Sequence, residues 1–268
     1  MQATPIDPQQ AGAVSSSTGP DPSIGDPIAF WKSEQSRPFE GWDFSPLGKR
    51  LKFEPLPWDY LATARRLAQA SQRLLDLGTG GGEVLERLAP LPKVCFATEL
   101  VPERAEVARR RLSSHGVTVL TLDQTITLPF EDAAFDLVLT RNSAFVAKLI
   151  FPILAQDGVY FTQQVGRGNL RELLEEFSIA DGNRDWKTPD EAVEELTRAG
   201  FAAVEMQSAD VDVEFADVGA LLYFLNAILP GRVDVQANSA ALERLQTRLN
   251  SGQALRFQRK RYLVTARK

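Results

Sequence analysis

The chain has 268 residues, of which 44% are hydrophobic and 24% are charged, a composition that suits an ordinary globular protein. Thirty Lys and Arg stand against 35 Asp and Glu, so the formal net charge is −5 and no overall positive field attracts nucleic acid. One cysteine and one histidine exclude an intrachain disulfide, a cysteine-rich zinc site and a histidine cluster, and we predict no metal site.

The N-terminal quarter of the chain divides into two segments. Residues 1–25 are rich in Pro, Ser and Gly and contain no Lys or Arg, and we predict a disordered leader there. We predict that residues 26–70 form an aromatic flap followed by a helix. The spacing from Phe30 to Tyr60 is irregular, but its many aromatic rings need an apolar surface to dock on.

Helical and strand patterns alternate from residue 60 onward. Short apolar runs bounded by Gly or Pro predict buried strands, and a 3.6-residue period predicts helices. The predicted strands are Arg73–Leu77, Val94–Thr98, Val117–Leu122, Phe135–Thr140, Val159–Val165, Phe201–Ser208 and Arg261–Ala266. The predicted helices are Tyr60–Ala70, Glu83–Ala89, Pro102–Ser113, Phe145–Ala155, Asn169–Phe177, Thr188–Gly200, Asp217–Leu229 and Asn238–Asn250. This alternation predicts an α/β, doubly wound, mostly parallel seven-stranded sheet in residues 71–268, with no internal repeat and no second core.

A glycine-rich loop follows the first predicted strand, in the sequence LLDLGTGGGE. Gly78, Gly80 and Gly82 allow a sharp turn and let a ligand touch the main chain without meeting a Cβ. In an open α/β sheet the ligand crevice lies at this end of the strands. A dinucleotide fingerprint needs glycine where Glu83 stands, and a carboxylate there opposes a pyrophosphate, so an NAD(P)-dependent oxidoreductase is the weaker alternative.

Two acidic residues follow at the ends of the next two predicted strands. Glu99 lies about 20 residues beyond the glycines, where a carboxylate can accept hydrogen bonds from both ribose hydroxyls. We expect Glu99 at an exposed strand end without a buried partner, so that its loss leaves stability unchanged. Asp123 can accept a hydrogen bond from an adenine amino group, although Asp also starts turns.

The residues DLGTGGG, Glu99, Asp123 and LPFEDAAFDLVLTRNSAF together resemble class I S-adenosylmethionine-dependent methyltransferases, in particular a group with an aromatic WDF and EPLPWDY leader. The resemblance implies a Rossmann-like methyltransferase fold with an antiparallel last strand, and S-adenosyl-L-methionine as cofactor. It implies that Asp76 and the glycine loop hold the methionine end, that Glu99 takes the ribose, and that Asp123 with Gln124 takes the adenine. The implied cofactor-binding residues are Asp76, Gly78, Thr79, Gly80, Gly82, Glu99, Leu100, Asp123, Gln124 and Asn142.

The acceptor side of the predicted site is less defined. Asn142 and Gln164 are candidate catalytic residues, and by strand alternation only one of Gln163 and Gln164 can face the crevice. Candidate substrate-binding residues are Trp58, Tyr60, Gln163, Tyr223 and Asn226. The aromatic leader and the apolar helix from Asp217 to Leu229 are candidate lids.

The predicted function is methyl transfer from S-adenosylmethionine to a small-molecule acceptor by direct displacement. Such a reaction requires alignment and exclusion of water more than a strong base, which agrees with the absence of a candidate active-site histidine. The alternatives are a non-catalytic S-adenosylmethionine binder and an RNA methyltransferase, for which the run Arg109-Arg110-Arg111 is a candidate patch. No signal peptide or membrane span is evident, so we expect no membrane contact and a cytoplasmic location.

Overall fold

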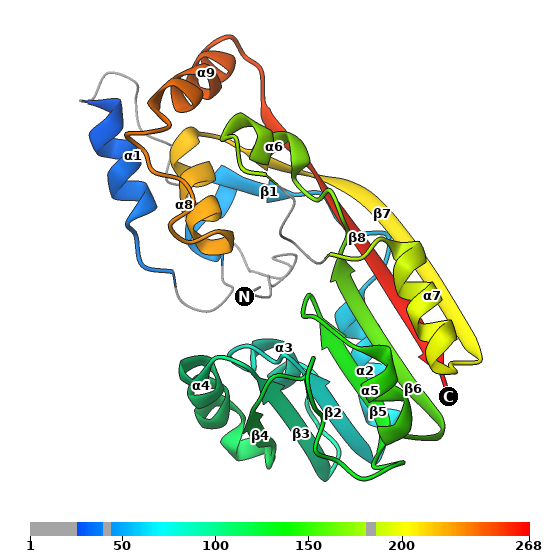
Figure 1. Cartoon of the computed structure of the whole chain (residues 1–268). Coiled ribbons are helices and arrows are strands. Elements are labelled where there is room, and N and C mark those ends of the chain that lie inside the picture. The colour runs from blue at the N-terminus through cyan, green and yellow to red at the C-terminus, as the bar shows by residue number, and fades with distance from the viewer. Residues whose placement is uncertain (1–25, 40–43, 181–185) are drawn as a thin grey trace.

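The computed structural model describes residues 26–39, 44–180 and 186–268, built around an eight-stranded sheet (Figure 1). The strand order is β1-β7-β8-β6-β5-β2-β3-β4. The predicted leader, residues 1–25, and the Trp42 and Asp43 of the WDF motif lie outside the described residues.

The sheet is parallel in its first part and antiparallel toward the C-terminal strands. The parallel strands are β2 (Arg73–Leu77), β3 (Val94–Glu99), β4 (Thr118–Thr121), β5 (Phe135–Arg141) and β6 (Leu154–Val165). The antiparallel pairs join β8 (Leu255–Arg267) to β6 and to β7 (Ala203–Phe215), and β7 to β1 (Leu51–Phe53). The predicted Rossmann-like architecture and antiparallel last strand are confirmed. The predicted count of seven is wrong, because the short edge strand β1 adds an eighth.

Helices cover both faces of the sheet, as the doubly wound prediction requires. The first face carries α2 (Tyr60–Ala70), α3 (Glu83–Glu86) and α4 (Pro102–Leu112), which continues into the 3₁₀ turn η2 (Ser113–His115). The second face carries α5 (Ala147–Ile153) and α7 (Pro189–Ala199). The predicted capping box is present, since Thr188 and Glu191 exchange side-chain and backbone hydrogen bonds at the start of α7. Each face therefore buries its own apolar cluster.

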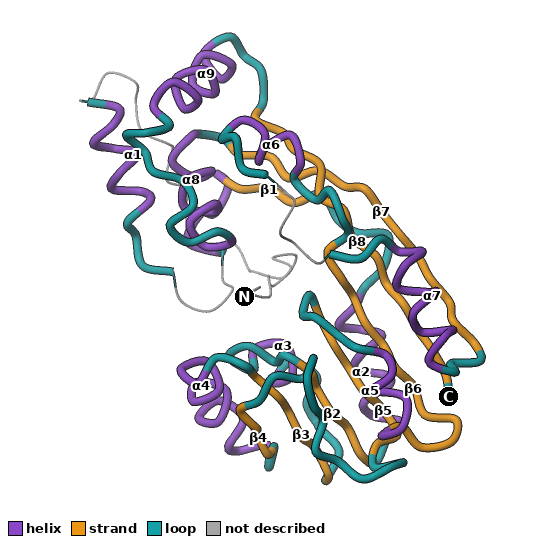
Figure 2. Tube along the Cα trace, in the orientation of Figure 1, coloured by secondary structure: helices purple, strands orange, loops and turns teal. Residues whose placement is uncertain are grey.

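A third apolar cluster lies at the far end of the β7 and β8 ribbon, so the prediction of a single core is wrong. Both strands are 13 residues long and run beyond the rest of the sheet, as Figures 1 and 2 show. The elements gathered there are β1, the 3₁₀ segment η1 (Ser45–Arg50), α1 (Pro27–Gln35), α6 (Arg171–Glu176), α8 (Val218–Ile228) and α9 (Ser239–Asn250).

The expectation of an irregular segment from Phe30 to Tyr60 is wrong, because α1 and β1 form within it. The expectation that its rings dock is confirmed, since Trp31 and Phe44 are buried in the third cluster with α8. The helix α8 is apolar on almost every side because it is buried there. Among the described residues, no helix is both long and apolar enough to cross a membrane.

Candidate functional site

The glycine loop crosses the carboxyl end of β3 directly after β2. Gly78, Gly80 and Gly82 all have left-handed φ angles, of 70°, 65° and 85°, so each position favours glycine. The amide of Gly78 donates to Thr98 Oγ1 at 3.1 Å, and the amide of Thr79 donates to the Thr98 carbonyl at 2.8 Å. These bonds fix the loop against the neighbouring strand.

Glu99 is buried and holds the same loop. One carboxylate oxygen accepts from the amide of Gly80 and the other from the amide of Val101, each at 2.9 Å. Only 6% of Glu99 is exposed, yet it lines a pocket. The expectation of an exposed Glu99 without a buried partner is wrong, because the turn from β3 into α4 folds back over its carboxylate.

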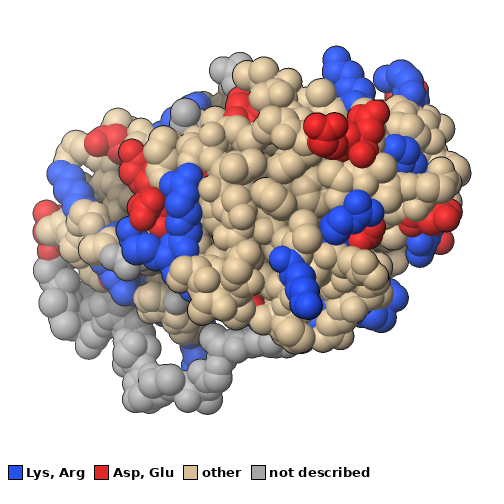
Figure 3. Space-filling model, turned by 90° about the horizontal axis from the view of Figure 1, so that it is seen from below, with Lys and Arg blue, Asp and Glu red and all other residues tan. Residues whose placement is uncertain are grey.

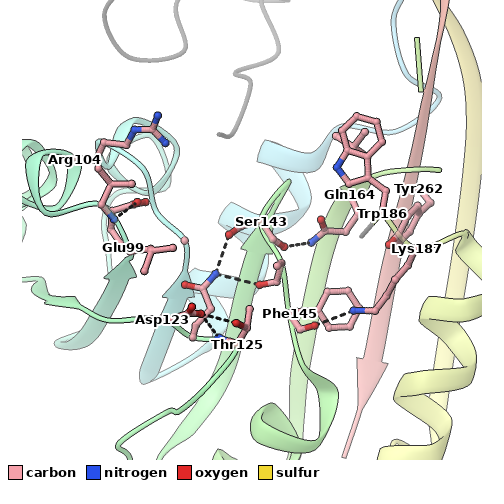
Figure 4. A pocket seen from close by; sticks show the side chains of 16 residues that line it. Glu99, Arg104, Asp123, Thr125, Ser143, Phe145, Gln164, Trp186, Lys187 and Tyr262 are labelled. Carbon is pink, nitrogen blue, oxygen red and sulfur yellow. Dashed lines mark hydrogen bonds between the residues drawn. The ribbon is translucent and has the colours of Figure 1, made fainter. Parts of the chain in front are cut away.

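The pocket has a volume of about 290 Å³ and lies at the carboxyl edge of the parallel strands (Figure 4). All five parallel strands contribute to it, as expected of a ligand crevice in an open α/β sheet. The predicted cofactor residues that line it are Gly78, Glu99, Leu100, Asp123 and Gln124. The sequence analysis therefore places half of its ten cofactor candidates in this pocket.

Asp123 and Gln124 are adjacent residues just after β4, and their side chains make different contacts. Asp123 Oδ1 accepts from the amide of Thr125 at 2.9 Å and from its hydroxyl at 2.6 Å, which makes a tight turn at the pocket wall. Gln124 Nε2 donates to Ser143 Oγ and the Ala144 carbonyl, and Gln124 Oε1 accepts from the Thr98 hydroxyl. Gln124 thus joins the ends of β3, β4 and β5, and its amide donors are already engaged.

Asp76 does not line this pocket and lies on the α2 face of the sheet. It is 6% exposed, and burial raises the pKa of its carboxyl from 3.8 to about 6. The guanidinium of Arg141 opposes that rise, and it also lies 5.5 Å from the centroid of the Tyr60 ring. Tyr60 in turn stacks on Phe161 with ring centroids 5.0 Å apart. A buried carboxylate in this position favours a cationic group of a ligand.

Gln163 and Gln164 point to opposite faces, as strand alternation predicts. Gln163 Oε1 accepts from Trp58 Nε1 at 2.8 Å, whereas Gln164 lines the pocket. Gln164 Nε2 donates to the Ser143 carbonyl and to Thr162 Oγ1, at 2.9 and 2.8 Å. Among the described residues no hydrogen bond is made to Gln164 Oε1, which is available to a ligand.

The comparisons with known proteins agree with this geometry. A sequence model described as a methyltransferase domain matches residues 75–150, which hold the glycine loop, Glu99 and Asp123. A malonyl-[acyl-carrier protein] O-methyltransferase of Geobacter sulfurreducens is 31% identical over 180 residues, which are 59% of this chain and 66% of that protein. A demethylmenaquinone methyltransferase of Thermus thermophilus is 37% identical over 124 residues, 42% of this chain and 56% of that protein.

The fold points the same way. The crystal structure of the YcgJ protein of Bacillus subtilis superposes with a TM-score of 0.58 at 19% identity, covering 78% of this chain and 97% of that chain. In both sequence and fold, this chain is similar to the class I S-adenosylmethionine-dependent methyltransferases. It spans just under two thirds of the first of these curated relatives and just over half of the second.

Several pocket residues were missed by the sequence analysis. They are Val101, Arg104, Thr125, Ser143, Ala144, Phe145, Val165, Trp186, Lys187 and Tyr262. Tyr262 lines the pocket because it pairs with Gln164 in the antiparallel register of β6 and β8. Sequence spacing does not determine this register. Ser143 and Phe145 directly follow the predicted Asn142, so extending the strand-end motif by three residues finds both.

Other candidates lie outside this pocket. Thr79, Gly80 and Gly82 lie in the loop behind Gly78, and Trp58 and Tyr60 lie on the α2 face. Asn142 is buried with a left-handed φ of 51°, and its amide donates to the Gln163 carbonyl at 2.7 Å. Tyr223 Oη donates to the Pro38 carbonyl and Asn226 Nδ2 to the Gln35 carbonyl, so this face of α8 packs against the α1 segment. The described residues contain no group of three His, Cys, Asp or Glu able to hold a metal ion.

Proposed function

We propose that this protein transfers a methyl group from S-adenosylmethionine to a small-molecule acceptor. One observation carries the proposal: the carboxylate of Glu99 faces the pocket while its two oxygens hold the glycine loop and the start of α4. A nucleoside seated there meets an acidic hydrogen-bond acceptor and close-approach glycines at once.

The residues fit that cofactor. Glu99 has lone pairs beyond those taken by the two amides, and these can accept hydrogen bonds from ribose hydroxyls. The buried carboxylate of Asp76, whose pKa is raised, suits the ammonium group of the methionine end. A Cβ at Gly80 would meet nothing closer than Glu83, at 4.0 Å, so the loop leaves room above that position.

Bound S-adenosylmethionine supplies an electrophilic methyl carbon attached to a sulfonium. The protein then has to orient the acceptor and exclude water. We assign the acceptor to the end of the pocket where Gln164, Trp186 and Tyr262 lie together, remote from Glu99 (Figure 4). Gln164 Oε1 can accept a hydrogen bond from an O–H or N–H group of the acceptor, and the two aromatic residues provide an apolar wall.

The relatives suggest which acceptors to test. Two of them are named for malonyl-[acyl-carrier protein] and demethylmenaquinone, and we propose these two compounds as the first acceptors to test. An RNA acceptor is less favoured, since the formal net charge is −5 and basic groups lie next to acidic ones on the face shown in Figure 3. A cytoplasmic location remains a prediction from the sequence.

The decisive experiment incubates the protein with methyl-labelled S-adenosylmethionine and separate acceptors: malonyl-acyl carrier protein, demethylmenaquinone, simple phenols and amines, and total RNA. We expect label in one of the small-molecule fractions and none with the Asp76→Asn variant. Label in RNA supports the RNA methyltransferase alternative. Binding of S-adenosylhomocysteine without transfer to any fraction supports the non-catalytic alternative, and nicotinamide dinucleotide binding in its place refutes the cofactor.

A further inference from the structure

The arginine run at the end of α4 has three members with different contacts. Arg109 bonds to Thr121 Oγ1 at 2.6 Å and to Glu106 at 3.3 Å. Arg110 is the most exposed of the three and lies 3.7 Å from Glu106. Arg111 alone turns toward the glycine loop. The run is therefore not a uniform basic patch, and its third member belongs to the neighbourhood of the pocket.

Arg111 contacts the loop and the helix that follows it at three points. Its Nε donates to the Gly81 carbonyl at 2.9 Å. One terminal nitrogen pairs with Glu86 at 3.1 Å and the other with Glu83 at 3.4 Å. The side chains of Arg111 and Glu83 are 35% and 14% exposed, against 67% and 54% for Arg110 and Glu106, so solvent screens the first pair less than the second.

The loop needs such contacts because its glycines and the short helix after it oppose or add little to its order. Gly78, Gly80 and Gly82 lose more conformational entropy on folding than other residues. The helix α3 that follows has four residues, fewer than a helix needs to be stable by itself. Within the loop, the amide of Gly82 donates to the Thr79 carbonyl at 3.1 Å, and further contacts that order the loop come from two sides.

Glu99 and Arg111 are the charged groups on those two sides. Glu99 accepts from the amide of Gly80, and Arg111 donates to the carbonyl of Gly81, the next residue along. The following residue, Gly82, is packed against α4 so closely that a Cβ would lie 3.0 Å from Leu112 Cδ1. The last turn of α4, which lies beside α3 in Figure 1, thus fixes the outer side of the loop.

We propose that Arg111 is a positioning residue for the cofactor, holding the peptide after Gly81 and the start of α3 so that the loop keeps its binding conformation. This inference rests on the proposed function only for the identity of the ligand. Arg111 touches no part of the pocket itself and acts through the glycine loop. Its guanidinium also pairs with Glu83 and Glu86, the two carboxylates of the helix that directly follows the loop.

The test compares Arg111→Ala with the matched control Arg110→Ala, which removes the same charge one residue away. Titration calorimetry with S-adenosylhomocysteine is expected to show a Kd raised roughly 5- to 20-fold in Arg111→Ala and changed less than about twofold in Arg110→Ala. Arg111→Lys should recover part of the affinity, because an ammonium reaches the carbonyl or a carboxylate but does not span all three. The kcat at saturating cofactor should stay within about twofold of wild type.

A second measurement does not depend on the cofactor. Hydrogen exchange of the amides in residues 78–86 should be faster in Arg111→Ala than in Arg110→Ala, with exchange in the ribbon unchanged. If Arg111→Ala does not fold, Glu86→Gln removes one of the three contacts and should give smaller shifts in the same directions. Wild-type affinity and exchange in a folded Arg111→Ala overturn the inference, as does an equal effect of Arg110→Ala. If wild type itself does not bind S-adenosylhomocysteine, the proposed function fails, and the exchange result still decides the role of Arg111 in the loop.

Discussion

Replacing Glu99 by alanine tests both functions that the structure gives to its carboxylate. The change removes the acceptors of two amide hydrogen bonds, one fully buried at Gly80 and one partly buried at Val101. A buried amide without a partner costs about 1 to 3 kcal/mol, whereas water from the pocket can replace the bond at Val101. We therefore expect the free energy of unfolding to fall by about 1 to 3 kcal/mol.

The same substitution should weaken cofactor binding. Each charge-assisted hydrogen bond to a ribose hydroxyl contributes about 1.5 to 3 kcal/mol before water replaces part of it, so we expect a 10- to 100-fold rise in Kd, roughly 1.4 to 2.8 kcal/mol. Because a ribose contact acts equally in ground and transition states, the KM for the cofactor should rise while kcat at saturation is spared.

Urea denaturation measures the first effect, and titration calorimetry with S-adenosylhomocysteine below the unfolding transition measures the second. The control is Glu103→Ala, which removes the same charge from an exposed position in the first turn of α4 and should change the unfolding free energy by less than about 0.5 kcal/mol. An unchanged unfolding free energy in Glu99→Ala contradicts the loop-holding role. Unchanged affinity, or a large loss of kcat with unchanged cofactor KM, contradicts the placement of the nucleoside.

Three further predictions concern the strand ends around the pocket. Folding raises the pKa of Asp76 from 3.8 to about 6, so between these pH values the folded state holds a proton that the unfolded state releases, and stability should fall as pH rises. Asp76→Asn should abolish up to about 3 kcal/mol of that fall, measured by urea denaturation from pH 4 to 8. A pH profile identical to that of wild type refutes the assignment. Gly78→Ala should lower the unfolding free energy by about 2 to 4 kcal/mol, because φ is 70° and the new Cβ would overlap Ser143 Oγ. A thermal melt measures this, and a Tm equal to that of wild type contradicts the loop geometry. Thr162→Val removes one acceptor of the Gln164 amide and should raise the KM of the methyl acceptor severalfold without raising that of the cofactor, so a selective rise in the cofactor KM would speak against Gln164 as an acceptor-side residue.

The elements nearest the site were predictable because local and long-range preferences agree there. The helix Tyr60–Ala70 and the strand Arg73–Leu77 form with the predicted bounds. The helix has an apolar stripe and the Asp59 side chain at its start, and the strand is an apolar run closed by glycine. Parallel strands buried on both faces leave a continuous apolar signal, which is why the order of the central elements was read correctly.

The ribbon and the N-terminal elements were harder to predict. Predicted strands of eight and six residues became β7 and β8 with 13 residues each, because Asp210, Asp212 and Glu214 interrupt the apolar pattern on β7. These carboxylates pair with Lys260 and Arg256 of β8, so the strand continues through polar residues that read as loop. Such a polar strand can be recognised only when its partner strand is known, and the sequence alone does not reveal which strands pair.

The pocket residues divide in the same way. Gly78, Glu99 and Asp123 lie at or just after the ends of the successive strands β2, β3 and β4, and the sequence analysis identified all three. Tyr262 and Trp186 come from segments about 100 and 22 positions beyond Gln164, and strand register and loop path bring them to it. No spacing rule connects such residues, so the acceptor side of the site becomes visible only in three dimensions.

The ribbon of strands β7 and β8 contributes residues both to the pocket and to the distant third cluster, so a single strand register positions both groups. Tyr262 faces the pocket while Phe257, five residues earlier on the same strand, faces the third cluster from the other side of the pleat. Deleting one residue between Phe257 and Tyr262 would turn one of the two to the wrong face, whereas a change of length in residues 229–238, which join α8 to α9, leaves both in place. An insertion at the tip of this ribbon is therefore expected to leave both faces in place, whereas an insertion along its shaft is expected to displace one of them.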